Sequence, residues 1–223
     1  MMSLKASTCT LFIFCFVPFV CMATPSLNLI IAMDIAVMTT NGVPCVDWAL
    51  VDQDIKVTNE RLAQVGSRIR VDNKRTFEAP DIIATNLYGW AVRYGNGVND
   101  RRVTTEAKAV VDAANPAPEN LCMIYVPRIH AIPNSSGVTW GTAIAPYYYT
   151  NPADFNYLGH AFIAAADNQS RFTFAHELLH IFDLVHVLEQ WNLMYPTPSI
   201  INTVSATKRL TLAQENTMKA KYQ

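Results

Sequence analysis

The chain has 223 residues, of which 51% are hydrophobic and 16% charged, and its formal net charge is −1. This composition excludes a disordered chain, and the near-neutral charge gives no reason to expect a nucleic-acid partner or a polybasic membrane-binding surface. A chain of this length is expected to form one domain with a substantial hydrophobic core.

The first 23 residues are typical of a secretory signal peptide. Lys5 precedes an apolar run from Leu11 to about Val20, and a cleavage site follows Ala23. An uncleaved membrane anchor is the alternative, although the apolar run is short for a transmembrane helix. We therefore expect a secreted protein, extracellular or (in a bacterium) periplasmic. Its mature chain, residues 24–223, should form a single domain without stable membrane association.

Cleavage after Ala23 would leave two cysteines, Cys45 and Cys122. In an oxidising compartment this even count predicts one disulfide, and two buried free thiols are the alternative. Glycosylation sequons begin at Asn134 and Asn168.

Strand and helix patterns alternate along the mature chain. In chain order they predict a buried strand at 27–38, a helix at 47–66, a short strand at 67–71, a helix at 104–115, a buried strand at 121–129, an edge strand at 137–144, a strand at 160–167, a helix from about 171 and a final helix at 211–222. The segment 72–103 shows no clear pattern. This order predicts an α/β sandwich with a mixed sheet.

The helix from about residue 171 contains the sequence AHELLHIFDLVH and is apolar around most of its circumference, which is typical of a buried helix. One stripe of it is polar, and consists of Thr173, His176, Glu177, His180 and Asp183. Burying these groups without a partner would cost several kcal/mol for each charge. A divalent cation makes the arrangement tolerable, and two imidazoles one turn apart suit zinc.

Glu177 is expected to point past the metal towards a bound water molecule, and would then act as the general base. The third ligand is Asp183 or His186. Asp183 would lie about 4.5 Å further along the helix axis than His180, too far for its short side chain. His186 reaches the ion only if the chain turns back near residue 183, where aspartate tolerates a left-handed conformation. We favour His186.

The segment HELLHIFDLVH resembles the metzincin zinc signature H-E-x-x-H-x-x-G-x-x-H, with His176, Glu177, His180 and His186 in register. Eight residues beyond His186, NLMYP resembles the Met-turn of that clan, with Met194 as its methionine. Asp183 stands where the clan has glycine. The residue after Met194 is tyrosine, as in matrixin-like sequences, and we expect it to pack rather than bind metal.

This resemblance implies a metzincin-like zincin sandwich: a mixed twisted sheet with an antiparallel edge strand, an active-site helix and a C-terminal helix. It also implies a zinc-dependent endopeptidase with one catalytic Zn²⁺, in which metal-activated water hydrolyses peptide bonds of a peptide or protein substrate and Glu177 is the general base. We expect a monomer. The residues expected to bind substrate are Thr139, Trp140 and Gly141 in the edge strand, with Tyr195 and Pro196 walling the pocket.

Two alternatives to a peptidase stay open. One is a catalytically inactive, metzincin-like zinc-binding interaction module. The other is a zinc hydrolase that acts on a non-peptide amide or ester. Outside the signature, His130 and His160 are expected to be surface or core residues, and the tyrosines at 147–149 to serve packing, although they could line a cleft.

Overall fold

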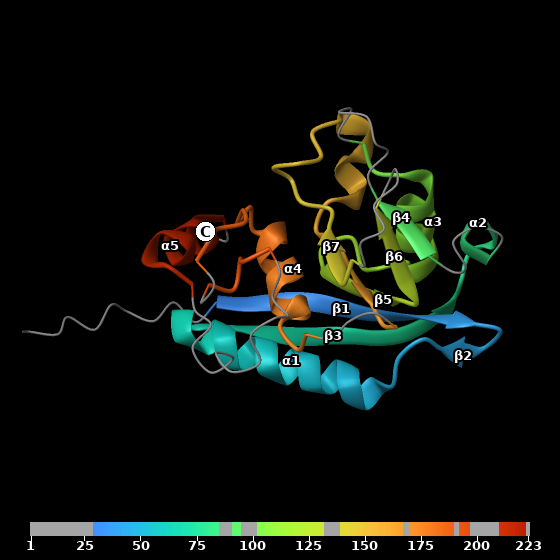
Figure 1. The fold of residues 1–223 in the computed structure, drawn as a ribbon, viewed down its shortest axis with the longest axis horizontal. Coiled ribbons are helices and arrows are strands. Elements are labelled where there is room, and N and C mark those ends of the chain that lie inside the picture. Colours follow the sequence, from blue (N-terminus) through green and yellow to red (C-terminus); the bar gives the residue numbers. More distant parts are fainter. Residues whose placement is uncertain are drawn as a thin grey trace, which may run out of the picture.

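The computed structural model describes residues 29–84, 91–94, 102–131, 139–166, 170–189, 192–196 and 210–221. Strands and helices alternate in it much as the sequence predicts (Figure 1). In chain order the elements are β1 (Leu29–Thr40), β2 (Val43–Pro44), α1 (Trp48–Leu62), η1 (Ala63–Val65), β3 (Ser67–Glu78), α2 (Asp81–Ala84), β4 (Ala91–Tyr94), α3 (Thr105–Ala114), β5 (Leu121–Val126), β6 (Arg128–Ala131), β7 (Gly141–Ala143), η2 (Pro152–Tyr157), β8 (His160–Ala164), α4 (Thr173–Ile181) and α5 (Leu212–Lys221).

A mixed sheet forms the centre of the described structure. β1 pairs in parallel with β3 on one side and with β5 on the other, and β5 pairs in parallel with β8. β7 runs antiparallel to β8 at the edge of this sheet, while β2 pairs antiparallel with the end of β1. The predicted mixed sheet with an antiparallel edge strand is therefore confirmed. A separate pair of parallel strands, β4 and β6, lies beside it.

β3 is longer than the predicted strand at 67–71, because it pairs with β1 almost from end to end. The second half of β3 is polar, so its sequence shows no strand pattern. There Asn73 donates to the buried carboxylate of Asp34 at 2.8 Å, and Arg75 forms an ion pair with the same group. Burial raises the pKa of Asp34, but the Ala117 N–H, the amides of Asn73 and Asn120 and the Arg75 charge together hold it below its ordinary value.

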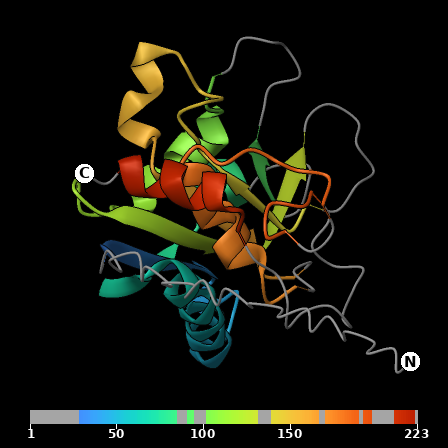
Figure 2. The same cartoon turned by 90° about the vertical axis from the view of Figure 1, so that its left-hand side faces the viewer.

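Helices cover both faces of the sheet (Figures 1 and 2). On one face α1 packs against β3 and α4 packs against β7 and β8, and the two helices contact each other over a core that includes Ile31, Met33, Val51, Leu62, Phe174 and Leu178. On the other face α3 packs against β1 and β3, and it shares with β5 and β8 a core that includes Val110, Val111, Cys122, Ile124 and Phe162. Helix α4 therefore belongs to the first of these two cores and lies beside the edge strand β7.

The predicted disulfide is wrong for this structure, in which Cys45 and Cys122 are free thiols. The Cys45 N–H donates to Met38 O at 2.9 Å, whereas Cys122 is paired with Asp34. These two positions on β1 are four residues apart, or about 13 Å along a strand. A disulfide needs Cα atoms within about 7 Å of each other, so the pairing of the sheet keeps the two thiols apart.

Three predictions fall outside the described residues: the signal peptide at 1–23 and the sequons at Asn134 and Asn168. Among the residues that are described, none of the helices combines the length and the hydrophobicity needed to cross a bilayer.

Candidate metal centre

Helix α4 is buried along its whole length, including its polar stripe. Every residue from Thr173 to Ile181 is buried, including His176, Glu177 and His180, which are at most 6% exposed. The helix begins where Ser170 accepts hydrogen bonds from the Phe172 N–H through its side chain and from the Thr173 hydroxyl through its carbonyl group. The sheet side of this helix is apolar, so its polar stripe faces away from the core beneath it.

The helix breaks where the sequence predicted a turn. Asp183 has a φ of 64°, in the left-handed region, at a cost of about 1 kcal/mol relative to glycine. The Phe182, Asp183 and Leu184 N–H groups donate to carbonyls of Leu179 and His180 at 2.9–3.2 Å, which closes the last turn of the helix. Beyond this break the chain turns back, and His186 returns to the two helical histidines.

Three imidazoles meet at one point. The Nε2 atoms of His176, His180 and His186 lie 3.0–3.2 Å from one another. Two nitrogens bound to one tetrahedral zinc ion at 2.0–2.1 Å would be about 3.3 Å apart, so the observed triangle fits such an ion with small adjustments. Among the described histidine, cysteine and acidic side chains, these three histidines form a cluster that could hold a metal, and Asp183 is not part of the cluster.

The outer nitrogens of the two helical histidines are held by carbonyl groups. His176 Nδ1 lies 2.6 Å from Leu193 O, and His180 Nδ1 lies 2.7 Å from Leu184 O. Because a carbonyl only accepts, Nδ1 carries the proton in both rings, and each Nε2 lone pair faces the other histidines. Burial and the neighbouring His186 lower the pKa of His180 to about 4, although the hydrogen bond to the Leu184 carbonyl acts in the opposite direction. The lowered pKa keeps the ring in its neutral form, which is the form that binds metal.

The predicted Met-turn lies next to the histidines, because Leu193 O contacts His176 and Met194 O contacts Val187. Met194 is fully buried, and its carbonyl accepts a hydrogen bond from the Val187 N–H at 3.0 Å, next to His186. Asn192 holds the turn: its side chain accepts from the Met194 N–H and donates to Gln214 of α5, both at 2.8 Å. The turn also supplies the Leu193 carbonyl that orients His176, so α5, the turn and the metal centre form one connected unit.

Glu177 lies against the edge strand. A Cβ atom on Gly141 of β7 would stand 2.5 Å from Glu177 Cγ, 2.6 Å from its Oε1 and 2.7 Å from Thr173 Cγ2. A glycine is therefore needed for this close approach of strand and helix. Burial raises the pKa of the Glu177 carboxyl to about 8, and a cation bound at the neighbouring histidines would lower it again.

The other residues predicted for substrate binding lie around this centre. Thr139 forms a single antiparallel bridge with Ile129, and the Trp140 carbonyl accepts from the Ala164 N–H at 2.8 Å, so both belong to the strand region leading into β7. Tyr195 is partly buried and Pro196 is exposed, immediately after the Met-turn. Of the two remaining histidines, His160 is buried in β8 and His130 is half-buried in β6, as expected for residues outside the signature.

Two residues that contact the centre were not among the predicted site residues. Asn192 was visible only as the first letter of NLMYP, and Tyr147 as one of three adjacent tyrosines. The Tyr147 hydroxyl lies 3.1 Å from His180 Nδ1, and its main-chain N–H donates to Asp183 at 3.2 Å. Both contacts join segments more than twenty residues apart in the chain, which a local pattern does not reveal.

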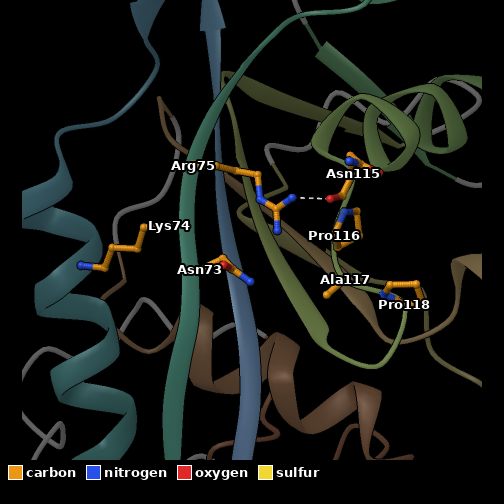
Figure 3. A pocket seen from close by; sticks show the side chains of 7 residues that line it. All are labelled: Asn73, Lys74, Arg75, Asn115, Pro116, Ala117 and Pro118. Atoms are coloured by element: carbon orange, nitrogen blue, oxygen red, sulfur yellow. Dashed lines mark hydrogen bonds between the residues drawn. The ribbon is translucent and has the colours of Figure 1, made fainter.

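A surface hollow elsewhere has a structural explanation. It lies where β3 passes the end of α3, and Figure 3 shows Arg75 bonded there to the Asn115 carbonyl while Lys74 points away towards α1. Arg75 is also paired with Asp34, and Lys74 with Asp52. Since these cations are already engaged, the hollow offers no charge for a ligand.

Comparisons with known proteins bear on the fold. No protein-family model matches the sequence, and no curated protein matches it either. Solved structures do match: archaemetzincin from Methanopyrus kandleri superposes with a TM-score of 0.51 at 14% identity, over 88% of this chain and 97% of that one. The chain has a metzincin-like fold.

Two further solved structures share this metzincin-like fold. Metalloproteinase-II from Bacteroides fragilis gives a TM-score of 0.52 at 13% identity over 90% of this chain, which spans about half (55%) of that longer chain. Mirolysin, solved in complex with a compound, gives a TM-score of 0.50 at 13% identity, over 86% of this chain and 91% of that one. At these identities the likeness establishes the fold, and the site must be argued from its own residues.

Proposed function

We propose that this protein is a zinc-dependent endopeptidase with Glu177 as its general base. The observation that carries the proposal is the meeting of His176, His180 and His186 through their Nε2 atoms beside a buried glutamate. The fold shared with archaemetzincin and metalloproteinase-II supports it. A zinc ion at these nitrogens would supply a Lewis acid that lowers the pKa of a water molecule and polarises a carbonyl group.

Glu177 would hold and return the proton. Its Oε1 lies at the closest approach of α4 to β7, so the carboxylate can accept a proton from water on that side of the centre and return it to a leaving amine.

The edge strand β7 would orient the substrate. Trp140 O and Ile144 N are both hydrogen-bonded towards β8, so in an antiparallel pair the intervening Gly141 and Ala143 direct their N–H and C=O groups away from it. An extended peptide could add to this side as a further strand, which would bring a peptide bond to Glu177.

The test is cleavage of a mixed peptide library by the mature protein, read by mass spectrometry, with bound zinc measured separately. We expect cleavage that a chelator abolishes and zinc restores. The Glu177→Ala variant should bind one zinc ion per chain without cleaving. Full cleavage by Glu177→Ala would refute the assigned base. Zinc-loaded protein that cleaves no peptide but hydrolyses small amides or esters would favour the alternative hydrolase, and no hydrolysis at all would favour the inactive module.

We also propose that residues 1–23 direct secretion. The charge and apolar run described above support this, and mass spectrometry of protein expressed with its full N-terminus tests it. The exported protein should begin at Thr24. Retention of the protein in the cell with Met1 or Met2 at its N-terminus would contradict secretion.

A further inference from the structure

Tyr147, in the segment that leaves the edge strand, contacts the turn that follows α4. It lies in a turn in which the Tyr148 and Tyr149 N–H groups both donate to Ala145 O at 3.1 Å. Its main-chain N–H donates to Asp183 Oδ1, and its hydroxyl lies 3.1 Å from His180 Nδ1. The backbone and the side-chain tip of Tyr147 thus contact two residues of the metal-binding segment, three positions apart.

The bond to Tyr147 accounts for an aspartate at a position where glycine would adopt the backbone more easily. Asp183 has a φ of 64°. A glycine there would relieve the strain, but it has no carboxylate to accept the Tyr147 N–H. With aspartate at this position the backbone is strained, but the side chain accepts a hydrogen bond from the Tyr147 N–H in the segment that follows β7.

The Tyr147 hydroxyl shares the outer nitrogen of a metal-binding histidine. His180 Nδ1 donates its proton to Leu184 O at 2.7 Å, so at 3.1 Å the Tyr147 oxygen is a second, longer acceptor for the same proton. Acceptors at this nitrogen fix the orientation of the ring and make its opposite nitrogen a better ligand. The tyrosine ring also packs against the imidazole, with ring centroids 6.0 Å apart.

We propose that Tyr147 is a positioning residue for His180, and that Asp183 holds it in place, so that metal binding and the order of the segment Ala145–Tyr149 are coupled. A metal that fixes the His180 ring also fixes the Tyr147 hydroxyl. By linkage, loss of the tyrosine contact weakens metal binding, and loss of metal loosens the segment. The inference rests on the metal centre of the proposed function, but not on peptide hydrolysis.

The first test removes the hydroxyl alone. In Tyr147→Phe we expect zinc affinity, measured by competition with a chromophoric chelator, to fall about tenfold, the lower end of the effect of such outer contacts. The visible absorption bands of the Co²⁺-loaded variant should shift, because the His180 ligand changes. Tyr148→Phe is the matched control. Tyr148 is 48% exposed and its ring packs edge-on against Tyr149, so this variant should retain the affinity and the spectrum of the unaltered protein.

The second test removes the carboxylate. In Asp183→Gly, zinc affinity should stay within a few-fold of the unaltered protein or rise, because the backbone strain is relieved. The Tyr147 amide, however, should exchange with solvent at least fivefold faster in NMR measurements on zinc-loaded protein. Adding zinc to the unaltered protein should slow this exchange.

Two results would overturn the coupling: a Tyr147→Phe variant that matches Tyr148→Phe in affinity and spectrum, or a Tyr147 amide whose exchange is unaffected by Asp183→Gly. Unaltered protein that binds zinc and cleaves nothing would refute hydrolysis alone and leave these measurements valid. Unaltered protein that binds no zinc would refute both proposals.

Discussion

Replacing Gly141 with alanine tests the close packing of the edge strand β7 against helix α4. The new methyl group would stand 2.5 Å from Glu177 Cγ and 2.7 Å from Thr173 Cγ2, and ordinary contact begins near 3.4 Å. Both of these atoms lie close to the α4 backbone, so a rotation of the carboxylate alone does not relieve the overlap. We expect β7 and α4 to separate by about 0.9 Å at this point.

The separation has two costs. Overpacking of this kind destabilises a protein by about 1–3 kcal/mol. A general base displaced by roughly 1 Å loses on the order of 10²-fold in rate. Because the three atoms nearest to the new methyl group belong to Glu177 and Thr173 and not to the three histidines, zinc affinity should change by much less than the rate.

The assay is kcat/KM on a cleaved peptide, together with bound zinc and the free energy of unfolding in urea. Thr142→Ala is the matched control, since its side chain lies on the opposite face of β7, and it should retain activity within about threefold. A Gly141→Ala variant as active and as stable as the unaltered protein would refute the close approach of strand and helix.

Three further predictions concern residues outside the three-histidine cluster. Burial, partly opposed by Asp34, lowers the pKa of His160 to about 4. Between pH 6.5 and 4 the unfolded chain therefore takes up a proton at His160 that the folded protein does not, and this residue should lower the free energy of unfolding by roughly 3 kcal/mol as the pH drops. In urea unfolding over this range, His160→Gln should lose roughly 3 kcal/mol less than the unaltered protein, and an equal loss in the two proteins would contradict the assignment. Asn192→Ala leaves the buried Met194 N–H without its acceptor and should cost about 1–3 kcal/mol in the same assay, whereas an unchanged midpoint would show that the turn does not depend on Asn192. Cys45 and Cys122 should both react with a thiol reagent when the protein is unfolded without reductant, and a lack of reaction would show that the two form a disulfide.

The metal centre could be predicted from sequence because its information is local. His176 and His180 are one helical turn apart, and the choice of His186 over Asp183 followed from the reach of a short side chain and the tolerance of aspartate for positive φ. The structure has this break at Asp183, and the histidines meet as expected. The burial of the α4 helix likewise followed from its apolar circumference.

Features that depend on pairing between distant segments could not be predicted in this way. The second half of β3 is polar, and it is a strand because β1 pairs with it. Cysteine count suggested a disulfide, but the register of β1 with β5 and the hairpin at β2 hold Cys45 and Cys122 apart. Tyr147 reaches His180 only because β7 lies beside α4, and no spacing in the sequence marks that contact.

X-ray absorption spectroscopy of zinc-loaded protein tests most directly whether the turn at Asp183 delivers the third ligand. The spectrum should show three imidazole nitrogens at about 2.0–2.1 Å, and His186→Ala should show two. Two results would contradict the account: a number of imidazole ligands that does not change in His186→Ala, or a carboxylate ligand that is present in the unaltered protein and lost in Asp183→Gly.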